Sequence, residues 1–290
     1  MNMGIVGFGV MGSNHKRVYE KIGHSVTDIY DPFVFPAKSL EDFIKQCRKN
    51  KVKGISICNP SNKHVEISLK ILSEIPNIYL LIEKPIAIEL EESKKLIPYT
   101  DRILVGHIEQ FNRAVIEFRQ WVDEGKFGKI FSIRTKRANN IPSREQIKDV
   151  ATDLLVHDIE VVNSIVGKTL TFKKFIKQST NNNKVYDHAH AILQYEDVIC
   201  YCEANWVSPI KERYLKVYST NGLIELNYSR QTINLTDTQG NSKELLSNDG
   251  YEEPLVKELQ HFTDIILNYV RPQVTVETGI RVLEILNEDI

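Results

Sequence analysis

The chain has 290 residues, of which 42% are hydrophobic and 26% are charged, and its formal net charge is −1. A near-neutral chain has no basic field to attract nucleic acid or an anionic membrane, and no apolar run approaches the roughly 20 residues of a membrane span. Four cysteines are too few for a disulfide scaffold, and no basic residues precede an apolar N-terminal stretch, so we expect a cytoplasmic protein without a secretory leader.

Short apolar runs and helix-like stretches alternate through the first hundred residues. The runs are MGIVG, VTDIY, GISIC, IYLLIE and RILVG. Alternation of strand and helix predicts a parallel sheet with helices on both faces, and nearly all-apolar runs are typical of strands buried on both sides. We therefore expect a doubly wound α/β domain over residues 1–108.

The pattern changes after residue 108. A helix is predicted at 109–125, a strand at 129–137, and a further helix at 152–166 that ends at Gly167. Residues from about 170 to 236 are predicted to form consecutive strands joined by turns such as NNN, YED and TNG. Helices at 255–269 and 278–287 close the chain. The sequence therefore predicts a second, α+β domain over residues 109–290.

A glycine-rich turn joins the first predicted strand to the first helix, with the pattern Gly7-x-Gly9-x-x-Gly12. Gly7 allows the tight turn, Gly9 lets the backbone approach a pyrophosphate, and Gly12 lets helix and strand pack closely. The helix N-terminus then offers free N–H groups to the phosphates. Strand, glycines and helix in this order predict a dinucleotide-binding site of the Rossmann type rather than a turn that binds nothing.

An acidic residue at the end of the second strand indicates which dinucleotide is bound. Asp31 lies 24 residues after Gly7, close to the separation of about 20 that such sites use. Its carboxylate can accept from the ribose hydroxyls and would repel a 2′-phosphate, so NAD is favoured over NADP. Asp28 is the rival acid, but strand alternation and position favour Asp31.

Ligands of open parallel sheets bind beyond the carboxyl ends of the strands, which makes strand-end residues candidates. Lys84 follows the fourth strand and precedes a proline, which restricts its backbone and permits a cis bond. A lysine here can donate to a substrate hydroxyl or carry the proton released on oxidation; the alternative is a surface lysine beside a turn. The other strand-end candidates are Asn59, Pro60, Glu83 and His107.

The helix predicted at 152–166 places Asp153 and His157 four residues apart, on one face. Histidine can accept a hydroxyl proton near neutral pH, and a nearby aspartate can orient it or hold the substrate. A buried structural histidine and a helix-capping aspartate, with Thr152 as the rival cap, are equally compatible with the pattern. The expected buried side of the helix is Leu154, Leu155, Ile159, Val162 and Ile165.

Two histidines and two cysteines lie on neighbouring predicted strands, and a zinc site would need all four to converge. If Glu196 and Asp197 form a two-residue turn, His190 faces Glu203 across the hairpin, and the two pairs point to opposite faces of the sheet; a one-residue shift would bring them together. Sheet packing is favoured, and we predict no metal. The four residues are His188, His190, Cys200 and Cys202.

Together these motifs resemble the Gfo/Idh/MocA oxidoreductase family over nearly the whole chain. The resemblance rests on GIVGFGVMGSNH, ICNPSNKH, IEKPIA, VGHIEQFNRAV, GKIFSIRTKR, DLLVHDIEVV, ANWVSPIKERYLKVYSTNGLIELNY and EPLVKELQHF. Its specific part is the lysine of EKP followed by Asp-x-x-x-His. It implies a Rossmann domain and then an open, mostly antiparallel sheet that carries substrate and often subunit contacts, hence a homo-oligomer, dimer or tetramer.

The resemblance also implies roles for the matching residues. Lys84, Asp153 and His157 match the catalytic set, with His157 as the acid/base. The glycines of the turn and Asp31 match the cofactor set. His107 and Asn112, in GHIEQFN, match residues near the nicotinamide and the substrate.

Within the family, VGHIEQFN, LLVHDIE and ANWVSPIKER look most like nucleotide-sugar 3-dehydrogenases, such as those acting on UDP-N-acetylglucosamine. That subgroup often has a Gly-Pro-rich loop after the arginine at 137, which here is RANNIPSRE, with Pro142 and Arg144 but no glycine. Basic residues that can neutralise a diphosphate, or be solvated charges, are Arg137, Arg144, Lys211 and Arg213.

The leading hypothesis is therefore oxidation of a sugar secondary alcohol to a ketone, with hydride transfer to NAD and His157 or Lys84 taking the proton. The preferred substrate is UDP-N-acetylglucosamine, oxidised at its 3-hydroxyl; a free sugar, inositol or polyol is the alternative. A dinucleotide-binding regulatory protein is a hypothesis of another class, and the presence of Lys84, Asp153 and His157 argues against it. A structural subunit that binds cofactor only for stability is a weaker option.

Overall fold

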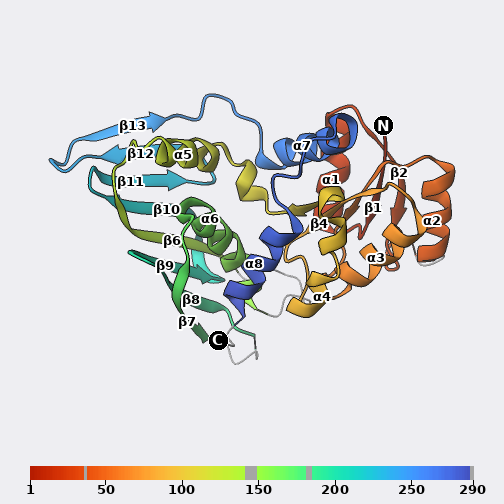
Figure 1. Ribbon diagram of the computed structural model, residues 1–290, viewed down its shortest axis with the longest axis horizontal. Helices are drawn as coiled ribbons and strands as arrows, with labels where there is room; N and C mark the ends of the chain where they lie inside the picture. Colours follow the sequence, from red (N-terminus) through yellow and green to blue (C-terminus); the bar gives the residue numbers. More distant parts are fainter. Residues whose placement is uncertain (36–37, 141–148, 181–184, 288–290) are drawn as a thin grey trace. The chain divides into compact units, whose positions relative to one another are not determined.

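The computed structural model describes residues 1–35, 38–140, 149–180 and 185–287, and the chain forms two compact units (Figure 1). The first unit comprises Met1–His107 and Glu252–Glu284, and the second begins at Ile108, runs to Tyr251 and takes up the chain again at Ile285. Among the described residues, no helix is both long and apolar enough to cross a membrane.

The first unit contains a parallel five-stranded sheet in the order β2-β1-β3-β4-β5. The order reverses at β1, as in doubly wound folds, so the predicted N-terminal α/β fold is confirmed. Every residue of β3 and β5 is buried, because the apolar runs are covered on both faces. The strands are β1 (Asn2–Val6), β2 (Ser25–Tyr30), β3 (Gly54–Ile57), β4 (Tyr79–Glu83) and β5 (Ile103–Gly106).

Helices connect these strands, and local signals set where they begin. The helix α2 starts with a capping box, in which the Ser39 side chain accepts from the Asp42 N–H and the Asp42 carboxylate accepts in return. The helix α1 begins directly after the glycine turn, at Gly9, without a side-chain cap. The helices are α1 (Val10–Lys21), α2 (Leu40–Lys49), α3 (His64–Glu74) and α4 (Leu90–Lys94).

Helix α7 and helix α8 as far as Glu284 belong to the first unit, although the sequence analysis assigned both helices to the second domain. A Cβ atom at Gly54 of β3 would lie 2.6 Å from Ile266 and 2.9 Å from Phe262, so α7 packs tightly on the sheet. The backbone N–H of Val105 also donates to the carbonyl of Val274 (3.0 Å). These contacts join residues far apart in the chain, which is why sequence spacing did not predict them. The two helices are α7 (Pro254–Asn268) and α8 (Val276–Leu286).

The second unit contains an eight-stranded sheet in the order β13-β12-β11-β10-β6-β9-β8-β7. Only β6 and β9 pair in parallel within this order, so the expected mostly antiparallel sheet is confirmed. The last strand, β13, was not predicted. The strands are β6 (Ile130–Asn140), β7 (Leu170–Gln178), β8 (His188–Tyr195), β9 (Val198–Asn205), β10 (Val207–Ser219), β11 (Gly222–Asn227), β12 (Thr232–Thr236) and β13 (Ser242–Leu246).

Two helices of this unit, α5 (Arg113–Asp123) and α6 (Val156–Val166), accompany the sheet. The segment 152–166 differs from the single α-helix that was predicted, because its first turn, η4 (Ala151–Leu155), is π-helical. A π turn has no sequence signature comparable to apolar spacing and often occurs at functional sites. Helix α6 ends, as predicted, at Gly167, whose φ of 60° is the left-handed conformation that glycine tolerates.

Candidate functional site

The glycine turn in the first unit has the geometry that its motif predicts. Gly7 has φ 84°, and a Cβ there would lie 2.4 Å from the backbone nitrogen of Asn59. A Cβ at Gly12 would lie 2.0 Å from the carbonyl oxygen of Gly7, so helix α1 approaches β1 only because both residues are glycine. Around Gly9, by contrast, no described residue other than its neighbours in the chain has an atom within 4 Å of where a Cβ would be. The backbone at Gly9 is therefore open to a phosphate group at the uncapped start of α1.

Asp31, the predicted ribose-binding acid, is linked directly to this turn. One carboxylate oxygen accepts from the backbone N–H of Phe8, between the first two glycines, at 2.7 Å. The other accepts from Phe33 and Val34 at 2.8 and 3.1 Å. These bonds hold the carboxylate beside the glycine turn, and the oxygen that accepts from Phe8 keeps a second lone pair that a hydroxyl donor can use. The turn, the helix N-terminus and the acid together fit a dinucleotide.

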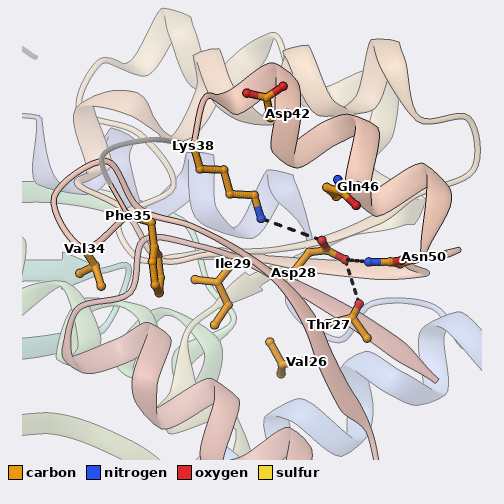
Figure 2. Close-up of a pocket in the computed structure, with 10 residues that line it drawn as sticks. All are labelled: Val26, Thr27, Asp28, Ile29, Val34, Phe35, Lys38, Asp42, Gln46 and Asn50. Atoms are coloured by element: carbon orange, nitrogen blue, oxygen red, sulfur yellow. Dashed lines mark hydrogen bonds and ion pairs between the residues drawn. The ribbon is translucent and has the colours of Figure 1, made fainter.

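The rival acid, Asp28, lies elsewhere and is bound by neighbouring side chains. It lines a hollow of about 850 Å³ between β2 and α2, which does not include the glycine turn. Figure 2 shows its carboxylate between Thr27 (2.9 Å), Asn50 (2.8 Å) and Lys38 (4.0 Å). Lys38 precedes α2 and Asn50 is the C-cap of α2, so Asp28 joins both ends of this helix to the edge strand β2, a structural role.

A buried polar network lies beneath the strand ends and includes Glu83, a predicted cofactor residue. His15 Nε2 donates to Glu83 Oε1 (3.0 Å), and His15 Nδ1 lies 2.9 Å from Ser56 Oγ, which Tyr19 also contacts (2.7 Å). Burial alone would raise the pKa of Glu83, but the hydrogen bond and charge of His15, together with Lys84, lower it. Glu83 is thus an ionised carboxylate that supports the turn carrying Lys84.

The same region contains the cluster of metal-type ligands His15, Cys58 and Glu83, whose ligand atoms lie within 4.8 Å of one another. Both ring nitrogens of His15 already have partners, and burial strongly raises the pKa of the Cys58 thiol. A thiol that keeps its proton is a poor metal ligand. The cluster is therefore a hydrogen-bonded network. His15 was not singled out in the sequence, although the H of GSNH follows the glycines directly.

Lys84 precedes a cis proline, Pro85, as its sequence position permitted. A second histidine that the sequence analysis did not single out, His64 of α3, ties this turn to the preceding strand end. Its Nδ1 lies 3.0 Å from the carbonyl oxygen of Pro85, and its Nε2 lies 2.8 Å from that of Asn59. The loop with Asn59 and Pro60 and the turn with Lys84 are therefore held by one buried side chain.

His107, at the end of β5, is also buried and lies in the electric field of Lys84. Burial, and secondarily the positive charge of Lys84, lower the pKa of His107 to about 4. Its Nδ1 is covered and has no hydrogen-bond partner among the residues that the structure describes. The imidazole is therefore neutral at pH 7 and buried at the end of β5.

In the second unit, η4 and α6 carry Asp153 and His157. All five apolar residues predicted for the buried side of this segment are buried, whereas Asp153 and His157 remain partly exposed. Neither Asp153 nor Thr152 caps a helix by its side chain; the carboxylate of Asp149 accepts from the Ala151 N–H at 2.7 Å instead. Helix capping therefore does not explain the presence of Asp153 at this position.

Arg137 does not fit its predicted diphosphate-binding role. It is 1% exposed, and its guanidinium donates to both oxygens of Asp158 (3.2 Å each) and to Glu109 (2.8 Å). The aromatic ring of Tyr228 lies 5.0 Å from the guanidinium carbon. With its donors bound to two buried carboxylates, Arg137 is an internal ion-pair residue that joins β6 to α6.

Asn112 likewise has a structural position rather than a free amide at a substrate surface. It is 1% exposed and is the N-cap of α5, where its oxygen accepts from the Ala114 N–H (3.1 Å). Its amide nitrogen donates to Glu109 and to the carbonyl of Tyr228, both at 2.9 Å. Of the remaining basic candidates, Lys211 and Arg213 lie on β10. Pro142 and Arg144 lie outside the described residues.

The hairpin of β8 and β9 has the predicted register. His190 pairs with Glu203 and Cys202 with Ala191, around the turn at Glu196 and Asp197. The cysteines are buried on the inner face of the sheet, while the histidines stack on the outer face with ring centroids 4.7 Å apart. The four side chains therefore do not converge as a zinc site.

Comparisons with known proteins agree with this organisation. Residues 1–102 match the family model described as "Oxidoreductase family, NAD-binding Rossmann fold", and residues 115–225 match "GFO/IDH/MocA C-terminal domain". A scyllo-inositol 2-dehydrogenase (NAD(+)) of Bacillus subtilis is 24% identical over 93% of this chain and 87% of its own length. Alignments with other curated relatives, including inositol 2-dehydrogenases and a UDP-N-acetylglucosamine 3-dehydrogenase, span about half the length of those proteins.

Solved structures share the fold at low identity. The UDP-N-acetylglucosamine 3-dehydrogenase of Acidithiobacillus ferrooxidans has a TM-score of 0.82 at 19% identity, covering 98% of this chain and 94% of that one. A levoglucosan dehydrogenase, in complex with NADH and levoglucosan, also has a TM-score of 0.82, at 16% identity, covering 97% and 94%.

Proposed function

Because the chain belongs to the Gfo/Idh/MocA oxidoreductase family, we propose that it is an NAD-dependent dehydrogenase that oxidises a secondary hydroxyl of a sugar to a ketone. The family consists of NAD(P)-dependent oxidoreductases that act on CH–OH groups. The observation that carries the proposal is the glycine turn: Gly9 is open to a phosphate at the start of α1, and Asp31 is hydrogen-bonded to the same turn. This favours NAD over NADP, since a 2′-phosphate would meet a carboxylate.

The proposed catalytic set is Lys84, Asp153 and His157. His157 accepts the hydroxyl proton, Asp153 orients the imidazole or the substrate, and Lys84 donates to a substrate oxygen. When bound, NAD supplies the hydride acceptor. Glu83 and His64 support the turn with Lys84, and the neutral His107 lies within the electric field of that lysine.

Two substrate classes follow from the motifs and the relatives. UDP-N-acetylglucosamine, oxidised at the 3-hydroxyl, is preferred because of the sequence motifs and the structural likeness to a protein named for that activity. An inositol or another neutral polyol is the alternative, supported by the name of the relative that aligns over most of both chains. The alternative that is not an enzyme is a regulatory protein that binds a dinucleotide.

We also propose that the protein is a homo-oligomer, a dimer or tetramer, formed through the outer face of the second unit's sheet. Large apolar side chains there have exposed fractions of 38% to 49%, and they alternate with half-buried residues on β7 and with buried residues on β9. Such an apolar face is typical of a protein–protein contact. These residues are Phe172, Ile176, Ile199 and Tyr201. The cytoplasmic location stays a prediction from the sequence.

The proposal is tested by NADH absorbance with purified protein, NAD or NADP, and a panel of UDP-sugars, free sugars and inositols. We expect NADH from one substrate class, and we expect His157→Gln and Lys84→Met to lower turnover roughly 100-fold or more while NAD affinity stays nearly unchanged. Lys94→Met, at an exposed lysine of α4, is the matched control and should keep turnover.

The outcomes separate the hypotheses. If both catalytic variants keep full turnover, the assigned mechanism is wrong. If NAD binds but no compound in the panel yields NADH, and no second substrate reoxidises a retained cofactor, the regulatory alternative gains support.

A further inference from the structure

Arg213 lies directly opposite Arg137 on neighbouring strands. Strands β10 and β6 pair in antiparallel orientation, and Arg213 and Arg137 are register partners. Residues that are opposite in register project to the same face, so both guanidinium groups belong to the face that packs against α6. Two like charges in this position repel each other unless each has a counter-charge.

Of the two arginines, only Arg137 has a counter-charge that is hydrogen-bonded to it among the described residues. Arg137 holds both oxygens of Asp158 and one of Glu109, and the second oxygen of Glu109 accepts from Asn112. Both carboxylates are thus occupied by other donors. Arg213 makes no side-chain hydrogen bond or ion pair with any described residue, and its Nε is buried without a partner. A covered N–H of a charged group without an acceptor is rare in folded proteins.

Lys211 adds a second cation two residues before Arg213 on β10. The positive charge of Arg213 is the largest cause that lowers the pKa of Lys211, so the two charges are close together. Burial, and then Arg137, lower the pKa of Arg213 itself. The charges of Glu109, Asp158 and Asp153 oppose this effect without supplying a hydrogen bond. Two cations are therefore held near each other, and within the described part of the chain the buried Nε of Arg213 has no acceptor.

These donors lie beside the segment that carries the proposed acid/base residues. Asp153, on η4, is close enough to Arg213 for its charge to raise the pKa of the guanidinium. A ligand that engages Arg213 would therefore lie within the electric field of Asp153, in the second unit. The planar guanidinium matches an oxyanion with two parallel hydrogen bonds, and an adjacent ammonium adds a point charge.

We propose that Arg213 and Lys211 bind an oxyanion carried by the substrate, either the diphosphate of a nucleotide sugar or the carboxylate of a sugar acid. This inference rests on the proposed dehydrogenase function for its choice of ligand, and it separates charged sugars from neutral polyols. An inositol offers hydroxyl groups only and would leave both cations without a counter-ion.

The experiment measures binding and turnover separately. UDP and glucuronate are titrated into the NAD-saturated protein by calorimetry, which distinguishes the diphosphate from the carboxylate. The variants are Arg213→Gln and Lys211→Met, and the control is Arg230→Gln, an exposed arginine of the same unit. We expect one of the two probes to bind, and its affinity to fall roughly tenfold or more in both variants but not in the control.

Turnover gives a second readout. With UDP-N-acetylglucosamine, or a sugar acid if glucuronate is the better probe, Lys211→Met should raise KM roughly tenfold and leave kcat within about threefold. Rates with a neutral polyol should not change. Lys211 is exposed, so this variant tests the site even if Arg213→Gln fails to fold.

Two results would overturn the oxyanion site: neither UDP nor glucuronate binds the wild type, or the bound probe keeps its affinity in both variants. Failure of the dehydrogenase proposal would look different. If UDP or glucuronate binds in a way that depends on Lys211 and Arg213 but no sugar yields NADH, the dehydrogenase activity is refuted and the oxyanion site is supported. NADH from a neutral polyol, without binding of either probe, refutes the site and keeps the activity.

Discussion

Replacing Glu160 by glutamine removes a buried carboxyl group whose protonation is coupled to folding. Glu160 is 2% exposed on α6, and its Oε1 accepts from Gln110 at 2.7 Å. Its Oε2 is covered and has no hydrogen-bond partner among the described residues. Burial raises its pKa from 4.5 to about 8, although the Gln110 hydrogen bond and the charge of Arg119 oppose the shift. The folded protein therefore keeps a proton there at neutral pH.

The sign of the pH dependence follows from this shift. The unfolded chain releases the proton near pH 4.5, whereas the folded chain keeps it up to about pH 8. Unfolding between these values releases a proton, so the stability falls as the pH rises, by about 1.4 kcal/mol per pH unit. Between pH 5.5 and pH 7.5 the wild type loses about 2.5 kcal/mol through this group. The glutamine of Glu160→Gln has the shape of the protonated glutamate and does not titrate, so this variant does not lose the stability that the wild type loses through Glu160.

The assay is urea unfolding of both proteins at pH 5.5, 6.5 and 7.5, followed by tryptophan fluorescence. The two tryptophans, Trp121 and Trp206, both lie in the second unit, so the signal reports the unit that contains Glu160. The unfolding free energy of Glu160→Gln relative to that of the wild type should increase by about 2.5 kcal/mol from pH 5.5 to pH 7.5. The exposed control Glu244→Gln should show no such increase. A constant difference for Glu160→Gln would mean that the folded protein ionises Glu160 normally, and the reasoning would be refuted.

Three further variants test other parts of the structure. Gly12→Ala places a methyl group 2.0 Å from the carbonyl oxygen of Gly7, so NAD affinity should fall more than roughly tenfold; unchanged affinity in a fluorescence titration would contradict the geometry of the turn. Arg137→Met leaves two buried carboxylates without their counter-charge and should cost about 3–5 kcal/mol of unfolding free energy in urea; a neutral result would argue against the ion pairs. Burial and the charge of Lys84 lower the pKa of His107 from 6.5 to about 4, so stability is full above pH 6.5 and falls by up to about 3.4 kcal/mol between pH 6.5 and pH 4. The stability of His107→Gln, measured by circular dichroism, should fall less steeply on acidification than that of the wild type. An unaltered pH profile would mean that His107 does not cause the acid loss of stability.

Local patterns predicted much of the fold. The apolar runs of β1 and β3, the glycine turn and the position of Asp31 follow from neighbouring residues, since a buried parallel strand and a phosphate-binding turn each impose their own composition. The register of the β8–β9 hairpin followed from its two-residue turn, because the period of a strand fixes which side chains share a face.

These local patterns could not predict contacts between residues that are far apart in the sequence. Arg137 was a reasonable candidate for a phosphate ligand, but it pairs with Glu109 and Asp158, which lie 28 and 21 residues away. Asn112 donates to a carbonyl 116 residues away, and His15 reaches Glu83 over 68 residues. The sequence analysis also did not predict the π turn before α6 or the placement of α7 and α8 in the first unit, because no spacing rule encodes either feature.

The sequence by itself determined the doubly wound domain, the glycine turn with its acid, and the candidates Lys84, Asp153 and His157, because each depends on residue types at short, fixed spacings. Only the tertiary structure decided which charged side chains are internal and which are free to meet a ligand. Arg137 and Arg213 have the same chemistry and stand opposite each other on paired strands. They differ because two distant carboxylates accept hydrogen bonds from Arg137, whereas no carboxylate of the described residues accepts one from Arg213. Convergence of this kind is a property of the folded chain alone.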